Sequence, residues 1–140
     1  MLIDNPLHES SLALPLIESV HLLGIIFGVG AAAVVDLRLL RVGMVKSSPA
    51  AVWRETMLPA LAGITLAVFS GLLLFSIDPE LYYTNTAFRF KMGALVAALG
   101  FYYTIVRRAA TRDREARVAA VLSLALFALI PLGGIFIGYE

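Results

Sequence analysis

Two uninterrupted apolar stretches constrain the fold of this chain more than any other feature of its sequence. They run from Thr56 to Ile77 and from Val118 to Tyr139, and each contains 22 residues without a charged side chain. About 20 apolar residues in an α-helix cross a hydrocarbon core about 30 Å thick. Since only 15% of the residues are charged and 60% are hydrophobic, the chain is too apolar for an ordinary soluble domain. The sequence therefore predicts an integral membrane protein.

Two further apolar stretches are shorter. Ser19 to Val35 and Met92 to Val106 contain 17 and 15 residues, so they reach the length of a span only by taking ionisable groups into the membrane at one end. With these two, the whole chain, residues 1–140, is expected to form a single transmembrane domain. We predict an all-α, four-helix bundle with helices at about 12–36, 56–77, 87–107 and 117–138.

The positive charges predict the orientation of this bundle. Lysine and arginine in short loops resist translocation across the membrane. The segment 36–55 and the loop before the fourth helix carry nine of them, namely Arg38, Arg41, Lys46, Arg54, Arg107, Arg108, Arg112, Arg114 and Arg117. The N-terminal segment has no lysine or arginine, and the remaining loop carries Asp78 and Glu80. We therefore expect a protein of the inner membrane whose basic loops lie in the cytoplasm. Its N- and C-termini are expected on the outer (periplasmic) side.

Several single residues are expected to mark helix ends and membrane boundaries. Asp36 is interpreted as the first cytoplasmic charge after helix 1, and Pro59 as a residue of the first turn of helix 2. Trp53 is expected to anchor the cytoplasmic interface. Pro131 is expected to kink helix 4. The segment Leu2–Leu12 is mildly amphipathic and is expected to lie along the outer surface.

Three ionisable residues are predicted to enter the membrane. Glu18 and His21 are three residues apart and share one helix face, and Lys91 lies near the outer end of helix 3. His21 is 15 residues from Asp36 and Lys91 is 16 residues from Arg107, which places them roughly 22 and 24 Å from the cytoplasmic side. The His21 and Lys91 side chains should therefore lie at similar depth, below the outer boundary.

Ionisable groups in lipid require partners or a polar cavity. Lys91 is expected either to pair with Glu18 or to extend to the surface. His21 is a structural residue or a ligand for a metal or for heme iron. The spacing of Glu18 and His21 suits a metal, but a di-metal bundle needs a second such motif, and no other glutamate or histidine lies in a predicted span.

Two glycines follow His21 on the same helix face. Gly24 and Gly28 either let another helix approach closely or leave room for a flat macrocycle, and the sequence leaves both interpretations open. The chain has no cysteine, so thiolate chemistry is excluded. Its net charge of +1 does not suggest nucleic-acid binding.

The order of these motifs resembles a known superfamily. It comprises His21, Gly24 and Gly28, then a basic loop, then Ser70-Gly71-Leu72-Leu73 and Phe90-Lys91. The pattern is similar to that of small four-helix membrane proteins that include the HemJ-type protoporphyrinogen oxidases and copper-resistance D-type domains. The resemblance implies a b-type heme near the outer side, with His21 as an axial ligand and Lys91 as the second essential polar residue.

One motif departs from the oxidase pattern. The oxidases carry an Asn-Glu-x-Pro-like motif before helix 4, where this chain reads Arg112-Asp113-Arg114-Glu115-Ala116-Arg117. The stretch Asp36-Leu37-Arg38-Leu39-Leu40 is closer to uncharacterised members of the superfamily. This departure weighs against porphyrinogen oxidation more than against heme binding.

The leading hypothesis is a heme b-binding membrane protein with a redox or electron-transfer role, which includes a heme-dependent oxidoreductase with a redox partner. The expected site comprises His21 as metal ligand with Lys91, Glu18, Gly24 and Gly28. Because six-coordinate iron needs a second donor, the candidates are Lys91, a small ligand, or His21 of a second chain in a homodimer. The alternatives are a proton- or ion-coupled transport module and an accessory subunit of a larger membrane complex.

Overall fold

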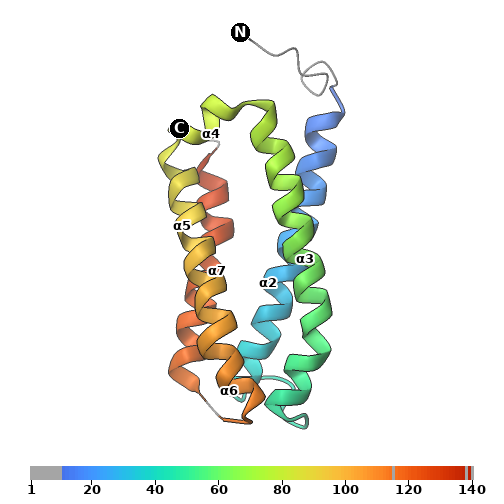
Figure 1. Cartoon of the computed structure of the whole chain (residues 1–140), viewed down its shortest axis with the longest axis vertical. Coiled ribbons are helices and arrows are strands. Elements are labelled where there is room, and N and C mark those ends of the chain that lie inside the picture. The colour runs from blue at the N-terminus through green and yellow to red at the C-terminus, as the bar shows by residue number, and fades with distance from the viewer. Residues whose placement is uncertain (1–10, 115, 138, 140) are drawn as a thin grey trace.

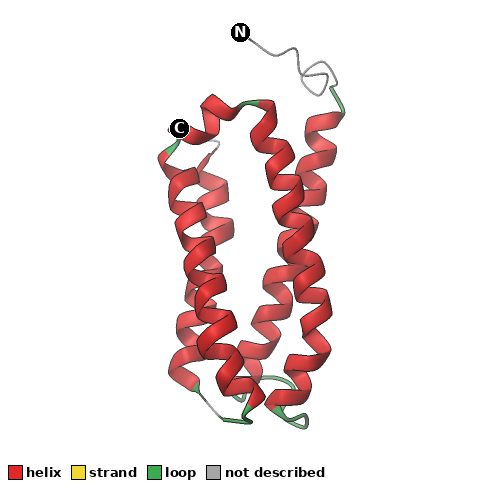
Figure 2. Cartoon of the chain, in the orientation of Figure 1, coloured by secondary structure: helices red, strands yellow, loops and turns green. Residues whose placement is uncertain are grey.

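The computed structural model describes residues 11–114, 116–137 and 139. Its secondary structure is helical throughout the described part of the chain, as Figure 2 shows. In chain order the elements are α2 (Ala13–Leu39), α3 (Pro49–Ile77), α4 (Pro79–Thr84), α5 (Thr86–Phe101), the π-helix η1 (Tyr102–Val106), α6 (Arg107–Thr111) and α7 (Arg117–Ile137). The prediction for the segment Leu2–Leu12 falls almost wholly outside the described residues.

The long helices lie side by side in two pairs. Helix α2 packs along α3, and α5 packs along α7 (Figure 1). Helix α2 begins and α7 ends at the same end of the molecule as α4, and we refer to this end as the α4 end. At the opposite end, the α6 end, lie the turn from α2 to α3 and the turn from α6 to α7.

Three helices are long and apolar enough to cross a membrane, namely α2, α3 and α7. Many large apolar side chains on these helices point outward, among them Phe27, Phe69 and Leu132. Such extensive exposure is unfavourable in water and suits a lipid environment. The sequence-based prediction of long apolar membrane helices is confirmed for these three. The fourth predicted span, 87–107, corresponds to a helical path interrupted by the π-helix η1.

Helix α3 begins earlier than the predicted start near residue 56. Ser48 is its N-cap, and the Ser48 hydroxyl accepts a hydrogen bond of 3.1 Å from the Ala51 amide. Pro49 occupies the first turn, where its missing amide hydrogen costs little. The Asp113 carboxylate accepts a hydrogen bond of 3.0 Å from the backbone amide of Ala50, which is also in the first turn. Pro59 consequently lies inside the helix and not in its first turn.

Small residues allow α2 and α3 to approach closely. A Cβ atom added to Gly24 would lie 2.5 Å from the backbone nitrogen of Ala67, and one added to Gly63 would collide with the backbone of Gly28. Contacts of this kind between small residues are the usual basis of helix association in membranes. Of the two interpretations of Gly24 and Gly28, close helix packing is therefore observed.

An aromatic cluster forms the core toward the α6 end. The Tyr102 ring lies 5.0 Å from Trp53, 5.2 Å from Tyr103 and 5.5 Å from Phe127, measured between ring centroids. The tilted and edge-on arrangements are those that aromatic pairs prefer. Trp53 is only 6% exposed, so it packs inside the protein and does not anchor an interface as expected.

Asp36 does not mark the end of helix 1. Helix α2 continues to Leu39, and Asp36 is 0% exposed. The reason is helical periodicity, since Ala32, Val35 and Leu39 are buried on the same side of α2. The Asp36 Oδ2 atom accepts a hydrogen bond of 2.7 Å from the hydroxyl of Ser123 in α7. Asp36 is therefore an interior residue and not a surface charge.

Candidate functional site

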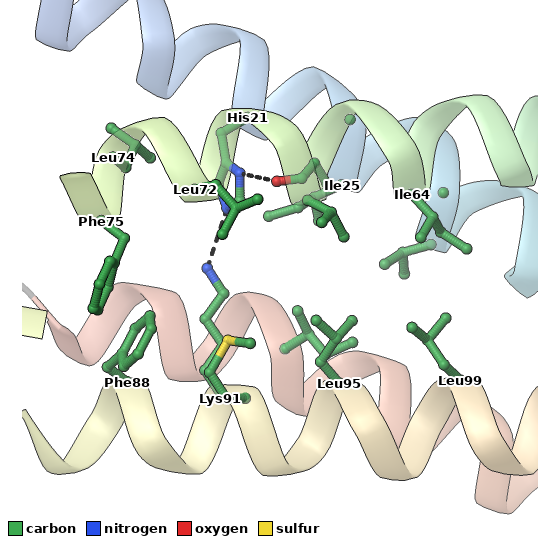
Figure 3. Close-up of a pocket in the computed structure, with 18 of the residues that line it drawn as sticks. His21, Ile25, Ile64, Leu72, Leu74, Phe75, Phe88, Lys91, Leu95 and Leu99 are labelled. Carbon is green, nitrogen blue, oxygen red and sulfur yellow. Dashed lines mark hydrogen bonds between the residues drawn. The ribbon is translucent and has the colours of Figure 1, made fainter. Parts of the chain in front are cut away.

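A pocket of about 340 Å³ lies between the two helix pairs. This volume falls in the range of small-molecule sites, about 300–1,000 Å³. Figure 3 shows that aliphatic and aromatic side chains form most of its wall. His21 from α2 and Lys91 from α5 point into it from opposite sides. The pocket is therefore an apolar space with one basic pair at its centre.

The His21 imidazole is oriented by α3. Its Nδ1 atom lies 2.8 Å from the Ala67 carbonyl oxygen and 3.1 Å from the Ser70 hydroxyl oxygen. A carbonyl only accepts hydrogen bonds, and the Ser70 hydroxyl donates its own proton to the Leu66 carbonyl at 2.6 Å. These partners assign the ring proton to Nδ1, which leaves a lone pair on Nε2 in the neutral imidazole.

Lys91 reaches this lone pair across the pocket. The Lys91 Nζ atom lies 3.3 Å from His21 Nε2, and Figure 3 marks the contact. An ammonium group has only donors, so it donates to Nε2. The similar depth predicted for the two residues agrees with this contact. The accepting nitrogen of the imidazole thus faces the pocket, where it accepts a hydrogen bond from the Lys91 ammonium group.

Three glycines outside the predicted site lie beside this pair. A Cβ atom on Gly71 of α3 would lie 3.1 Å from His21 Cε1. A Cβ atom on Gly133 would lie 3.1 Å from Lys91 Cβ, and one on Gly134 would lie 3.5 Å from Lys91 Nζ. A small residue is therefore needed at Gly133, whereas a Cβ atom at Gly134 would make an ordinary van der Waals contact with Lys91.

An aromatic group lines the pocket toward the α4 end. Phe75 and Phe88 stack at 5.9 Å, and Tyr82 lies 5.5 Å from Phe88. Burial is the main cause that raises the pKa of the Tyr82 hydroxyl, and the nearby charges of Glu18 and Asp78 add to it. Tyr82 therefore remains a neutral hydrogen-bond donor at this side of the pocket.

The structure does not bring Glu18 into the pocket. Glu18 is exposed on α2 and is absent from the pocket wall. Glu18 and Lys91, both within the described part of the chain, form no hydrogen bond or ion pair with each other, and Lys91 contacts His21 instead. Gly24 and Gly28 line one side of the pocket while they pack against α3. Of the five predicted site residues, His21 and Lys91 are thus the two polar residues that contact each other.

The pocket does not supply a set of protein ligands for a bare metal ion. Among the described residues, no group of three or more histidine, cysteine, aspartate or glutamate side chains could hold one. His21 Nε2 can contribute a single nitrogen. A single donor of this kind suits a metal ion that already carries other ligands.

Comparison with known protein families, with curated proteins and with solved structures finds no match to this chain. The resemblance based on His21, Gly24, Gly28 and Lys91 therefore remains a prediction.

Proposed function

We propose that the chain is a four-helix membrane protein of the inner membrane, with its α4 end facing the periplasm and its α6 end facing the cytoplasm. Helices α2, α3 and α7 provide three spans, and the path through α5, η1 and α6 provides the fourth. The charge distribution supports the orientation, because the basic turns that follow α2 and α6 lie at the α6 end.

We propose further that the pocket binds heme b and that His21 Nε2 would hold its iron. One observation carries this proposal: the Ala67 carbonyl holds Nδ1 so that the Nε2 lone pair faces an apolar pocket. Metal-bound histidines almost always donate their other ring N–H to a carbonyl, a carboxylate or water. A porphyrin supplies four iron ligands itself, so a single protein nitrogen suffices to anchor it.

The residues around His21 fit such a group. The wall is apolar apart from the basic pair and the Tyr82 hydroxyl, and Gly71 and Gly134 place no side chain beside the imidazole and the amine. Lys91 has to release Nε2, which its flexible stem permits. Its amine would then be free to hold the iron or to pair with a propionate. When bound, heme supplies a reversible one-electron couple within the membrane.

An absorption spectrum of the purified protein tests the proposal. The full chain is expressed with added heme, purified in detergent and measured for a Soret band. We expect the band in the wild type, its loss in His21→Ala and its retention in His8→Ala, which removes the other histidine of the chain. A helical circular dichroism spectrum of each variant excludes misfolding. A colourless wild type, or an unchanged band in His21→Ala, would contradict heme binding.

The same preparation tests the second iron donor. If Lys91 coordinates the iron, Lys91→Met converts a low-spin spectrum to a high-spin one while the Soret band persists. An unchanged low-spin spectrum would assign the second position to a small ligand or to a homodimer. A colourless protein whose substrate uptake depends on His21 and Lys91 would favour the alternative of a proton- or ion-coupled transport module.

A further inference from the structure

A second polar site lies toward the α6 end and is centred on Asp36. Asp36 is 15 residues from His21 along α2, or roughly 22 Å in a helix. Phe127 separates the two sites, since it lines the pocket on one side and packs edge-on against Tyr102 on the other. The Asp36 carboxyl therefore cannot share the chemistry of the pocket directly.

The Asp36 carboxyl has one hydrogen bond for two oxygens. Oδ2 accepts from the Ser123 hydroxyl, whereas the buried Oδ1 atom has no hydrogen-bond partner. The nearby Tyr102 hydroxyl does not supply one. Oδ1 accepts no hydrogen bond from any group of the described residues, Tyr102 included.

Among the residues that the structure describes, no cation compensates a negative charge on Asp36. Ser123 from α7 and Tyr102 from η1 are the polar groups that face it, and among the described residues no lysine or arginine forms an ion pair with it. The Arg38 side chain on the same helix turns to the Ser47 carbonyl. The charged residues of the neighbouring helices are exposed, namely Arg54, Glu55, Arg107, Arg108 and Arg117.

The balance of these contacts decides whether the Asp36 carboxyl is protonated. A buried carboxylate with a single donor and no cation loses nearly all of its hydration without compensation. A neutral acid loses far less, since its unsatisfied group is a single hydroxyl on Oδ1. Ser123 remains a suitable donor to the carbonyl oxygen of that acid. Asp36 thus has the surroundings of a carboxyl that carries a proton.

We propose that Asp36 is a proton-binding site, which holds its proton on Oδ1 and exchanges it with water at the α6 end. Helix α2 ends three residues beyond Asp36, about 4.5 Å along the axis, whereas Phe127 blocks the opposite direction. Loss of the proton places an uncompensated charge between α2, η1 and α7. The site thereby makes the packing of the α6 end depend on pH.

Infrared spectroscopy of the full chain in detergent tests this proposal. We expect the carbonyl stretch of a protonated carboxyl at neutral pH, and its absence from Asp36→Asn, which keeps the shape and the acceptor for Ser123. In Ser123→Ala the band should shift toward that of a carbonyl without a hydrogen bond. The absence of the band from the wild type at neutral pH, or its persistence in Asp36→Asn, would overturn the proposal.

Thermal unfolding across pH provides a second measurement. The folded state keeps a proton that the unfolded chain releases, so stability should fall as pH rises from about 4, the pKa of an unfolded aspartate, to neutral values. Asp36→Asn should lack this fall. A sodium-dependent rise in the unfolding temperature of the wild type, absent from Asp36→Asn, would identify a metal cation as the ligand and overturn the assignment of a proton. Both measurements can be made on His21→Ala, so their outcome does not depend on heme.

Discussion

At the residue scale, the orientation of one imidazole depends on backbone and side-chain groups of a neighbouring helix. The Ala67 carbonyl and the Ser70 hydroxyl hold Nδ1 of His21, and Gly71 allows the ring to lie against α3. Ser70 is itself 1% exposed, so this support is shielded from solvent. The residues Ser70 and Gly71 of the resemblance motif thus have a physical role beside the histidine.

Replacement of Gly71 tests that role. In Gly71→Ala the new Cβ atom would lie 3.1 Å from His21 Cε1, so the ring must shift by a few tenths of an ångström. We expect heme affinity to fall about tenfold, equivalent to about 1.4 kcal/mol, in a titration of the apoprotein. Gly93→Ala is the matched control, because nothing lies within 4 Å of the added Cβ atom. Equal affinities for the two variants would contradict the role of Gly71.

At the element scale, α2 and α3 pack against each other through small residues. Their contact depends on backbone-to-backbone approach at Gly24, Gly28 and Gly63, where lipid tails offer no hydrophobic drive for association. The same approach brings the Ala67 carbonyl within reach of His21. Helix packing and the geometry of the site are therefore coupled.

A substitution at this contact should destabilise the protein strongly. A Cβ atom in Gly63→Ala collides with the backbone of Gly28, which cannot rotate away as a side chain can. We expect a loss of about 3 kcal/mol, at the upper end of the range for overpacking, measured by unfolding in mixed detergent. In Gly30→Ala the added atom meets open space, so this variant should gain about 0.5–1 kcal/mol of helix stability. Similar stabilities for the two variants would refute the packing argument.

Several of these elements could be predicted from the sequence, and the exceptions have physical causes. Counting residues from the charged turns placed His21 and Lys91 at one depth, because near-parallel helices rise at a common rate. Counting residues gives the depth of a side chain but not the direction in which it points from the helix axis. It therefore could not show that Lys91 contacts His21 and not Glu18. Asp36 was assigned to the surface because a lone charge after an apolar stretch resembles an interface residue. The apolar Leu37, Leu39 and Leu40 that follow it were the available sign that the helix continues.

At the scale of the whole molecule, the two helix pairs converge at the α6 end and enclose the pocket toward the α4 end. The core of Trp53, Tyr102 and Phe127 joins them, and the Asp113 carboxylate ties the turn after α6 to the start of α3. A pocket near one membrane face and a proton site near the other give the molecule two chemically different ends. Their assignment to the two sides of the membrane decides which solvent reaches each site.

Accessibility labelling can determine that assignment, and the absence of native cysteine makes the experiment direct. Glu80→Cys places a thiol in α4, and Lys46→Cys places one in the turn between α2 and α3. Because the basic turns resist translocation, a membrane-impermeant maleimide applied to cells with an intact inner membrane should label Glu80→Cys but not Lys46→Cys. Both variants should react after permeabilisation, which controls for thiol reactivity. The opposite pattern would place the His21 pocket near the cytoplasm and expose Asp36 to periplasmic protons.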